Sequence, residues 1–369
     1  MAKFLKYCLI YLSVIFISIH ALISIQRIIS TYAPDFSVLY VSAGNLIAGR
    51  QLYGANLYTE LAYPPFTLLV FLPFLLIPFT PAQALWVIAS FIAFLAIVYM
   101  CLKLAVPKPD LICWMFACSL FFIYFPTKYT LGMGQLNFIA LFGLILAIFL
   151  NARNRYQQAA MSLAFGLILK PQLILILPFL HLFWKNKVVQ TGISIMILVI
   201  LGGIIIFGLG GYLTYVTDIV PLYADFSARQ VYYNQNLAAL FSRLLPTEPA
   251  RYLSYLSSIG LYLSTFLFVL RHQKITLADL AVVFPLLLLV EPLAWQHHYV
   301  FLIPAFIFLW PQLNMKYRSL LIISGFLIGW NIKSPQNITS WASPLILSHT
   351  CIGAMMLYLI CLKQLLTGK

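Results

Sequence analysis

Unbroken apolar runs recur along almost the whole chain, and they decide the class of fold. Two of them, Leu141 to Leu150 and Ile195 to Leu209, contain no charged residue. The 369 residues are 63% hydrophobic and 8% charged, whereas a soluble domain carries about 25% charged residues. Transmembrane barrels instead alternate apolar and polar residues over strands of about 10 residues. The sequence therefore predicts an all-α, polytopic integral membrane protein with one domain over residues 1–369.

Positive charge dominates the polar residues, with 22 Lys and Arg against 8 Asp and Glu and a formal net charge of +14. In a soluble protein this balance would suggest a nucleic-acid partner. In a membrane protein, however, bases accumulate on cytoplasmic loops and near anionic headgroups. We therefore expect the membrane, and no nucleic acid, among the partners.

Familiar chemical signatures are missing from the sequence. It contains no Gly-x-Ser-x-Gly elbow, no Walker loop and no Rossmann fingerprint, so a cytosolic nucleotide donor has no evident binding site. We expect neither a cofactor nor a metal site. The cysteines lack the paired spacing of a zinc site and are predicted to be reduced core residues; they are Cys8, Cys101, Cys113, Cys118, Cys351 and Cys361.

Helices are expected wherever the apolar runs approach the length of about 20 residues that crosses a bilayer. The predicted segments are 4–26, 64–79, 82–102, 109–125, 135–150, 157–169, 171–184, 188–209, 252–270, 276–291, 298–312, 318–333 and 340–362. Only two polar connections are long, 27–63 and 210–251. Prolines divide segment 64–79, and because each interior proline removes a helix hydrogen bond, it is predicted to be a partial or re-entrant helix.

Pairs of basic residues predict the orientation of the chain. They recur at short connections and at both ends: Lys3 and Lys6, Lys103 and Lys108, Arg153 and Arg155, Lys185 and Lys187, Arg271 and Lys274, Lys316 and Arg318, Lys363 and Lys369. If these pairs are cytoplasmic, the chain crosses the membrane about 12 times with both termini inside. Both long connections, 27–63 and 210–251, then lie on the extracytoplasmic face, where we expect them to share a cavity.

The few acidic residues limit the choice of a catalytic carboxylate. Asp110 and Asp279 come at predicted helix starts, where a carboxylate caps backbone amides and interacts well with the helix dipole. Three acids in the second long connection are expected to be solvated charges: Asp218, Asp225 and Glu248. Asp35, Glu60 and Glu291 remain, all near helix ends on the predicted extracytoplasmic face.

Asp35 opens a stretch that reads as a short helix lying on the membrane surface. The residues expected on its apolar face are Phe36, Leu39, Tyr40, Ala43, Leu46 and Ile47. An acid fixed at this helix start is well placed to take a proton from a hydroxyl acceptor. The spacing alone is equally compatible with an ordinary N-cap.

Lys170 stands between two apolar segments, 157–169 and 171–184, where a charge costs roughly 2.5–3.5 kcal/mol on insertion scales. Broken helices of this kind usually line a cavity. A phosphate group would satisfy the ammonium, and so would a buried acid such as Glu291. The sequence leaves both partners open.

Two further polar clusters break the apolar pattern on the same predicted face. Glu291 to Tyr299 includes His297 and His298, which are adjacent and therefore weak as a metal pair but suitable as donors to a phosphate or to hydroxyls. Gln135 and Asn137 start another apolar segment. They serve either as a helix cap or as substrate contacts.

Four stretches resemble a known enzyme family. They are "DFSVLYVSAGNLIAG" from Asp35, followed by Tyr53 and Tyr63-Pro64-Pro65, then "GQLNFIALFGLILA" at 134–147, "GLILKPQLILILP" at 166–178 and "EPLAWQHHYVFLIPA" at 291–305. Together they resemble glycosyltransferase family 87, the polyprenyl-phosphate-mannose-dependent mannosyltransferases of GT-C fold. That family usually has a small residue before the proline of the His-His motif, and Glu291 departs from this.

The resemblance implies a multi-pass enzyme of the cell inner membrane or plasma membrane with an extracytoplasmic active site. It implies inverting transfer of a hexose, mannose in the family, from a polyprenyl-phosphate sugar donor to a lipid or glycan acceptor. The family's first-loop Asp, the proposed general base, matches Asp35. The residues predicted to bind the donor phosphate or substrate are Lys170, Gln172, His297, His298, Gln135, Asn137, Tyr63 and Glu60.

Two other classes of protein compete with this interpretation. A transporter or flippase for a lipid-linked or anionic solute also uses an intramembrane Lys and broken helices, but it binds its substrate near the bilayer midplane. Here the polar residues gather toward one predicted face. A structural membrane subunit would give Lys170 and the two His no purpose.

Overall fold

The computed structural model describes residues 2–54, 60–184, 186–223, 229, 231–272 and 275–367, and within these ranges helices dominate. The β pairing found among them is a single antiparallel bridge between Asn234 and Trp295. The predicted all-α class is therefore confirmed. Asp225 and three of the predicted cytoplasmic bases, Lys185, Lys274 and Lys369, lie outside the described residues.

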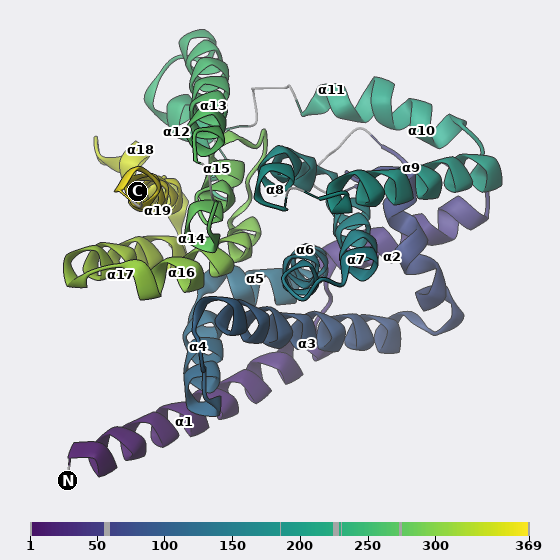
Figure 1. Ribbon diagram of the computed structural model, residues 1–369. Helices are drawn as coiled ribbons and strands as arrows, with labels where there is room; N and C mark the ends of the chain where they lie inside the picture. The colour runs from purple at the N-terminus through teal and green to yellow at the C-terminus, as the bar shows by residue number, and fades with distance from the viewer. Residues whose placement is uncertain are drawn as a thin grey trace.

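The first half of the chain runs from α1 to α9 (Figure 1). Its helices, with η marking a 3₁₀ helix, are α1 Ala2–Ser30, α2 Pro34–Ile47, η1 Pro65–Leu76, α3 Phe79–Ala105, α4 Leu111–Ile123, α5 Phe125–Met133, α6 Asn137–Asn151, α7 Tyr156–Leu169, η2 Pro171–Ile176, α8 Leu177–Trp184 and α9 Val188–Phe207. Figure 1 shows α1 at one edge of the array, beside α3 and α4, with which it packs.

The second half runs from α10 to α19. Its helices are α10 Gly210–Thr214, the π-helix η3 Tyr215–Ile219, α11 Val220–Leu222, α12 Leu237–Leu244, α13 Thr247–Leu270, α14 Leu277–Leu280, α15 Val283–Val290, η4 Gln296–Leu302, α16 Ile303–Leu309, η5 Trp310–Gln312, α17 Met315–Gly329, η6 Pro335–Asn337, α18 Ser343–Ile346 and α19 His349–Thr367.

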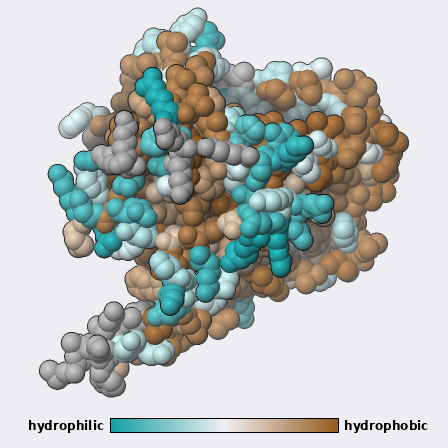
Figure 2. Space-filling model, in the orientation of Figure 1, coloured by the Kyte–Doolittle hydropathy of each residue, from teal (hydrophilic) through white to brown (hydrophobic). Residues whose placement is uncertain are grey.

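Four described helices are long and apolar enough to cross a membrane: Phe79–Ala105, Val188–Phe207, Thr247–Leu270 and His349–Leu366. A fifth crossing results if α4 and α5, bent by 72° at their junction, count as one span. Figure 2 shows hydrophobic residues over much of the visible surface, with hydrophilic residues gathered across its middle and left. The membrane class is thus supported, but the predicted count of 12 crossings is not confirmed, because several apolar segments fold as shorter helices.

The connection 210–251 is more ordered than predicted. Instead of a long polar loop, its described part contains α10, η3, α11 and α12, and α13 already begins at Thr247. The Asn236 side chain starts α12 by accepting a hydrogen bond from the Ala239 amide at 2.8 Å. Such an Asn cap, followed by an amphipathic run, is a helix signal that the overall polarity of the segment conceals.

Both elements predicted in the first long connection and the segment after it are present. Segment 64–79 forms η1, a 3₁₀ helix with Pro73 inside it, so the prolines do prevent a regular α-helix. The predicted helix after Asp35 is α2, which buries Phe36, Leu39 and Ala43 against η1 and α3. Its place on the membrane surface stays a prediction. Ile47 is an exception to the predicted apolar face, because its side chain is 59% exposed at the end of the helix.

The acids that were predicted to be helix caps, Asp110 and Asp279, and those predicted to be solvated charges, Asp218 and Glu248, behave as expected. Asp110 caps α4 by accepting from the Cys113 amide at 2.7 Å, and Asp279 forms a capping box with Thr276. Asp218 is exposed, and Glu248 forms an exposed pair with Arg251. None of these acids lies in a position to act on a substrate together with Asp35.

All six cysteines are free thiols, as predicted. Cys101, Cys118, Cys351 and Cys361 are buried in the core, whereas Cys8 and Cys113 are only half-buried. The side chains of the described residues form no cluster of three or more His, Cys, Asp or Glu able to hold a metal ion.

The close packing of α6 against α7 positions one side of the site. A Cβ on Gly143 would lie 2.9 Å from the Gly166 backbone nitrogen, so the two glycines allow the helix backbones to approach. Because the chain reverses direction between these helices, the start of α6 and the end of α7 lie at the same end of the pair. This brings the Gln135–Asn137 segment and Lys170 to one end of the molecule's core.

Candidate active site

A cavity of about 140 Å³ lies where α2, α5, α6, η2 and η4 converge. As predicted, both long connections contribute to it, with Asp35, Glu60 and Tyr63 from the first and Tyr223 from the second. The other lining residues are Val38, Leu39, Ala62, Tyr129, Met133, Gln135, Gln172, Leu293, Trp295, His297 and His298. Most of the polar residues singled out from the sequence therefore meet around one space.

Asp35 lies in the first turn of α2, but its carboxylate does not cap the helix. The N-cap is Ala33, which has no side-chain capping bond. Instead, the Gln135 side-chain amide donates to Asp35 Oδ2 from the start of α6. The N-cap interpretation of Asp35 is therefore wrong, and its carboxylate is available to the cavity.

Gln83 fixes the approach to α2 and was missed by the sequence analysis. Its Oε1 accepts from the Ala33 amide at 2.9 Å, and its Nε2 donates to the Thr31 carbonyl at 2.7 Å. The side chain is only 3% exposed. A glutamine inside the apolar segment 82–102 is the signal that could have revealed it, since a buried amide needs partners.

Gly134 allows the start of α6 to reach Asp35. Its φ of 69° lies in the left-handed region, and a Cβ there would be 2.6 Å from Phe36 Cβ. Its carbonyl also accepts from Trp86 Nε1 at 2.9 Å. A residue with a side chain would be strained at this position and would push α2 away from Gln135.

Gly134→Ala is therefore expected to destabilise the protein by about 1–3 kcal/mol and to impair whatever reaction depends on Asp35. Gly132→Ala is the matched control, because no atom lies within 4 Å of the position its Cβ would take. Thermal unfolding in detergent measures both variants. Equal melting temperatures for the two would contradict the role given to Gly134.

Burial raises the pKa of Asp35 to about 6, although the hydrogen bond from Gln135 and the charge of Lys170 lower it in part. A carboxylate with a pKa near the working pH is a suitable general base, since it is ionised and yet accepts a proton readily. The environment of Asp35 therefore fits the role that its position suggests.

Gln135 connects Asp35 to Tyr63. Its Oε1 accepts from the Tyr63 hydroxyl at 3.3 Å, while its Nε2 donates to Asp35. Burial raises the pKa of Tyr63 well above its usual value, so the phenol stays protonated and can donate. The Tyr63 carbonyl in turn accepts from Tyr53 at 2.9 Å. Gln135 and Tyr63 thus orient the carboxylate.

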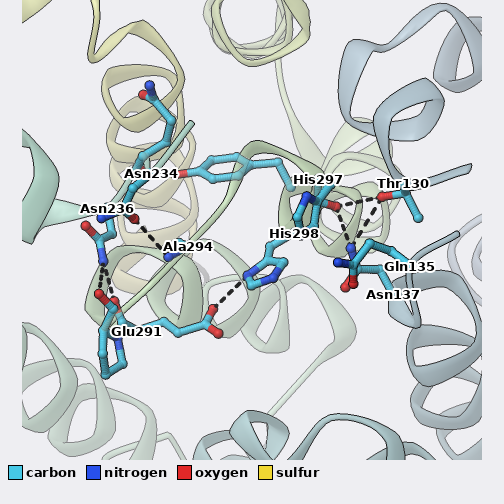
Figure 3. Close-up of polar contacts among 12 residues, drawn as sticks. Thr130, Gln135, Asn137, Asn234, Asn236, Glu291, Ala294, His297 and His298 are labelled. Carbon is cyan, nitrogen blue, oxygen red and sulfur yellow. Dashed lines mark hydrogen bonds and ion pairs between the residues drawn. The ribbon is translucent and has the colours of Figure 1, made fainter. Parts of the chain in front are cut away.

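A second part of the site is the segment from Glu291 to His298, which a cluster of buried amides holds in place (Figure 3). Asn236 Nδ2 donates to the Glu291 carbonyl at 2.5 Å, and Asn234 Oδ1 accepts from the Ala294 amide at 3.1 Å. The Gln235 backbone N–H donates to the Ala294 carbonyl at 2.8 Å. All three amide side chains are fully buried.

These three residues were not predicted to be part of the site, because 210–251 was expected to be a polar loop. The available signal was the run Asn234-Gln235-Asn236 between aromatic and apolar residues. Consecutive amides are normal on a loop surface, so their burial depends on the long-range bridge to Trp295, which no local pattern contains.

Asn137 positions His297 rather than capping α6. Its Nδ2 donates to the His297 carbonyl at 2.9 Å, and Thr130 Oγ1 donates to the same carbonyl at 2.8 Å (Figure 3). The helix cap is Leu136. Asn137 does not line the cavity of Asp35, and its Oδ1 is buried without a partner among the described residues, so its contact with substrate stays a prediction.

His297 and His298 face the cavity with little solvent contact, each 5% exposed. Both ring nitrogens of His297 lack a hydrogen-bond partner within the described part of the chain. His298 Nδ1 lies 3.5 Å from Glu291 Oε2, and Figure 3 marks this contact with a dashed line. Buried polar atoms are rarely left unpaired, so the free nitrogens of His297 indicate a ligand position.

Lys170 does not line the cavity of Asp35. Its side chain is 2% exposed and borders a separate cavity of about 20 Å³ together with Gln172, Glu291 and His298. Among the described residues no carboxylate oxygen lies within the 4.0 Å limit of an ion pair with its Nζ. Gln172 and His298 line both cavities, so they separate Lys170 from Asp35.

Glu60 differs from the other predicted site residues because it is exposed. It borders the cavity of Asp35 and also a larger groove beside α2. Its position allows contact with a substrate that enters from outside the protein.

Comparison with known proteins adds one finding. The model of glycosyltransferase family 87 matches residues 61–292, more than half of the chain. This range includes Tyr63, Gln135, Lys170 and Glu291, whereas Asp35 precedes it. No curated protein and no solved structure gives a significant match.

Proposed function

Because this chain belongs to glycosyltransferase family 87, we propose that it transfers a hexose, mannose by the family resemblance, from a polyprenyl-phosphate donor to a lipid or glycan acceptor. The observation that supports this reaction is the cavity shared by Asp35, His297 and His298. It brings together a carboxylate base and the imidazole nitrogens of His297 and His298, which can donate hydrogen bonds. A sugar held between them would have its acceptor and its leaving group on opposite faces.

The chemistry follows from this arrangement. Asp35 removes the proton from the acceptor hydroxyl as its oxygen bonds to the anomeric carbon. The bond from that carbon to the phosphate oxygen breaks, with inversion, and the electron pair leaves with the polyprenyl phosphate. His297, His298 and Gln172 donate to the departing phosphate, and the charge of Lys170 favours the added negative charge.

The membrane orientation is part of the same proposal. The basic pairs favour about 12 crossings with cytoplasmic termini. The cavity then opens on the extracytoplasmic side of the inner or plasma membrane, where a lipid-linked donor replaces a nucleotide sugar.

The test is incubation of the purified protein with polyprenyl-phosphate mannose labelled in the sugar, together with membrane extract. We expect labelled glycan or glycolipid and free polyprenyl phosphate. Movement of intact donor across a vesicle membrane, without cleavage, would instead indicate the flippase alternative.

The pH dependence should report the ionisation of Asp35. With a pKa of about 6, kcat/KM for transfer should fall about tenfold per unit below that pH and level off above it. Stability should change in the opposite direction. The folded-state pKa exceeds the unfolded value, so this group stabilises the fold below about pH 4, and that contribution is lost as the pH rises through 6.

These opposite slopes separate catalysis from denaturation. Rates measured between about pH 5 and pH 8, with thermal unfolding at each pH, give both curves. A rate that is flat across this range would contradict a base with the pKa of Asp35.

A further inference from the structure

A groove of about 510 Å³ lies between α2 and the segment that follows it, lined by Val38, Ser42 and Asn45 of the helix and by Gln51, Tyr53 and Glu60. Its volume is typical of sites for small ligands, which occupy roughly 300–1,000 Å³. It shares Val38 and Glu60 with the cavity of Asp35, so the two spaces adjoin. The steps of the proposed reaction take place in the cavity of Asp35 and leave this groove without a role.

The groove continues a stripe of α2 that begins at the base. Asp35, Val38, Ser42 and Asn45 are spaced by three, four and three residues, which places them on one face of the helix. Val38 lines both spaces, and Ser42 and Asn45 line the groove. At 1.5 Å per residue, the stripe extends about 15 Å from Asp35, more than one sugar ring requires.

The polar groups along the groove match the chemistry of sugar hydroxyls. The Ser42 hydroxyl and the Asn45 amide make no hydrogen bond within the described part of the chain, although both border the groove. Ser37 accepts from Tyr32 at 2.5 Å, which leaves its own proton free to donate outward. Hydroxyl and amide groups both donate and accept, as polyhydroxylated ligands require.

Charge narrows the class of ligand. Glu60 is the one side chain bordering the groove that is charged at neutral pH, among the residues described. A carboxylate accepts hydrogen bonds from hydroxyls but repels phosphate and sulfate. The groove is therefore suited to a neutral glycan and unsuited to an anionic headgroup.

We propose that this groove binds the neutral oligosaccharide part of the acceptor. The reacting hydroxyl lies at Asp35, and the following sugar rings lie along α2 toward Asn45. This inference rests on the proposed function, because it assigns the groove to the acceptor of that reaction. It narrows the acceptor from a lipid or glycan to a substrate with more than one sugar ring.

The test measures binding of octyl mannosides with one, two or three rings to the full-length protein in detergent, by saturation-transfer NMR titration. The affinity should rise with each ring. Asn45→Trp should abolish this gain by filling the groove. Asn45→Ala, which removes one hydrogen-bonding group without adding bulk, should weaken binding of the three-ring ligand roughly twofold to tenfold.

Ile47→Trp is the matched control, because Ile47 is exposed on the same helix and does not border the groove. It should bind all three ligands as the wild type does. Affinity that is independent of ring number, unchanged binding by Asn45→Trp, or tighter binding of a phosphorylated analogue would each overturn the assignment.

Cleavage of polyprenyl-phosphate mannose by the wild type is measured separately. If the donor is never cleaved but binding depends on ring number, the proposed transfer reaction fails and the groove remains a glycan site. If the donor is cleaved and ring number has no effect, the groove assignment alone fails.

Discussion

Replacing Asp35 by Asn should lower the rate of sugar transfer about 10²- to 10⁴-fold, the range that general-base catalysis contributes. The amide has the shape of the carboxylate and can still accept the hydrogen bond from Gln135, but it cannot take the proton of the acceptor hydroxyl. Because Asp35 does not cap α2, the helix loses no capping bond. Expression, melting temperature and donor binding should therefore stay close to those of the wild type.

Asp218→Asn provides the control for this experiment, since it makes the same chemical change at an exposed carboxylate outside the cavity. It should transfer sugar at the wild-type rate. Retention of more than about a tenth of the activity by Asp35→Asn would remove Asp35 from the general-base role. Glu60→Gln would then be tested next, because Glu60 borders the same cavity.

Local signals in the sequence located most helices and several of their ends. The apolar runs predicted 135–150 and 157–169, and the structure has α6 at Asn137–Asn151 and α7 at Tyr156–Leu169. The break at Lys170 was predictable because Pro171 cannot continue the helix hydrogen bonds. These features depend only on residues within one or two helical turns.

The role of a side chain was harder to predict where the same residue type can either cap a helix or contact a distant part of the chain. Asp35 and Asn137 both follow helix starts, where either side chain could accept from free backbone amides. In the structure Asp35 pairs with Gln135, and Asn137 holds the His297 carbonyl. The choice depends on neighbours about 100 and 160 residues away in the chain, which no local pattern contains.

The residues that were missed share this dependence on distant partners. The Gln83 side chain bonds to Thr31 and Ala33 across the α2–α3 packing, and the side chains of Asn234 and Asn236 bond to the Glu291–Ala294 segment. Each is a buried amide whose burial is unfavourable without those particular partners. Such residues can be recognised from sequence as anomalies, but their roles follow only from the fold.

Replacing Lys170 by Met should weaken donor binding roughly 10- to 100-fold and leave the protein folded, because the buried cation attracts the donor phosphate through space from behind Gln172 and His298. The geometry gives the reason for expecting a ligand. Lys170 is buried, yet within the described chain it forms no direct ion pair. Lys333→Met, which removes an exposed cation, is the control.

A structural role for Lys170 predicts a different result for the same variant. If Lys170 is a structural counter-ion of Glu291, whose charge acts on it, its loss leaves a buried carboxylate unpaired and should cost about 3–5 kcal/mol of stability. Lys170→Met would then unfold at a lower temperature, and Glu291→Gln in the same chain would restore the melting temperature. Lys170→Arg should rescue neither donor binding nor stability, because a planar guanidinium presents its donors in a different geometry from an ammonium. Donor binding and melting temperature, measured on these variants together, therefore distinguish a phosphate ligand from an internal ion pair.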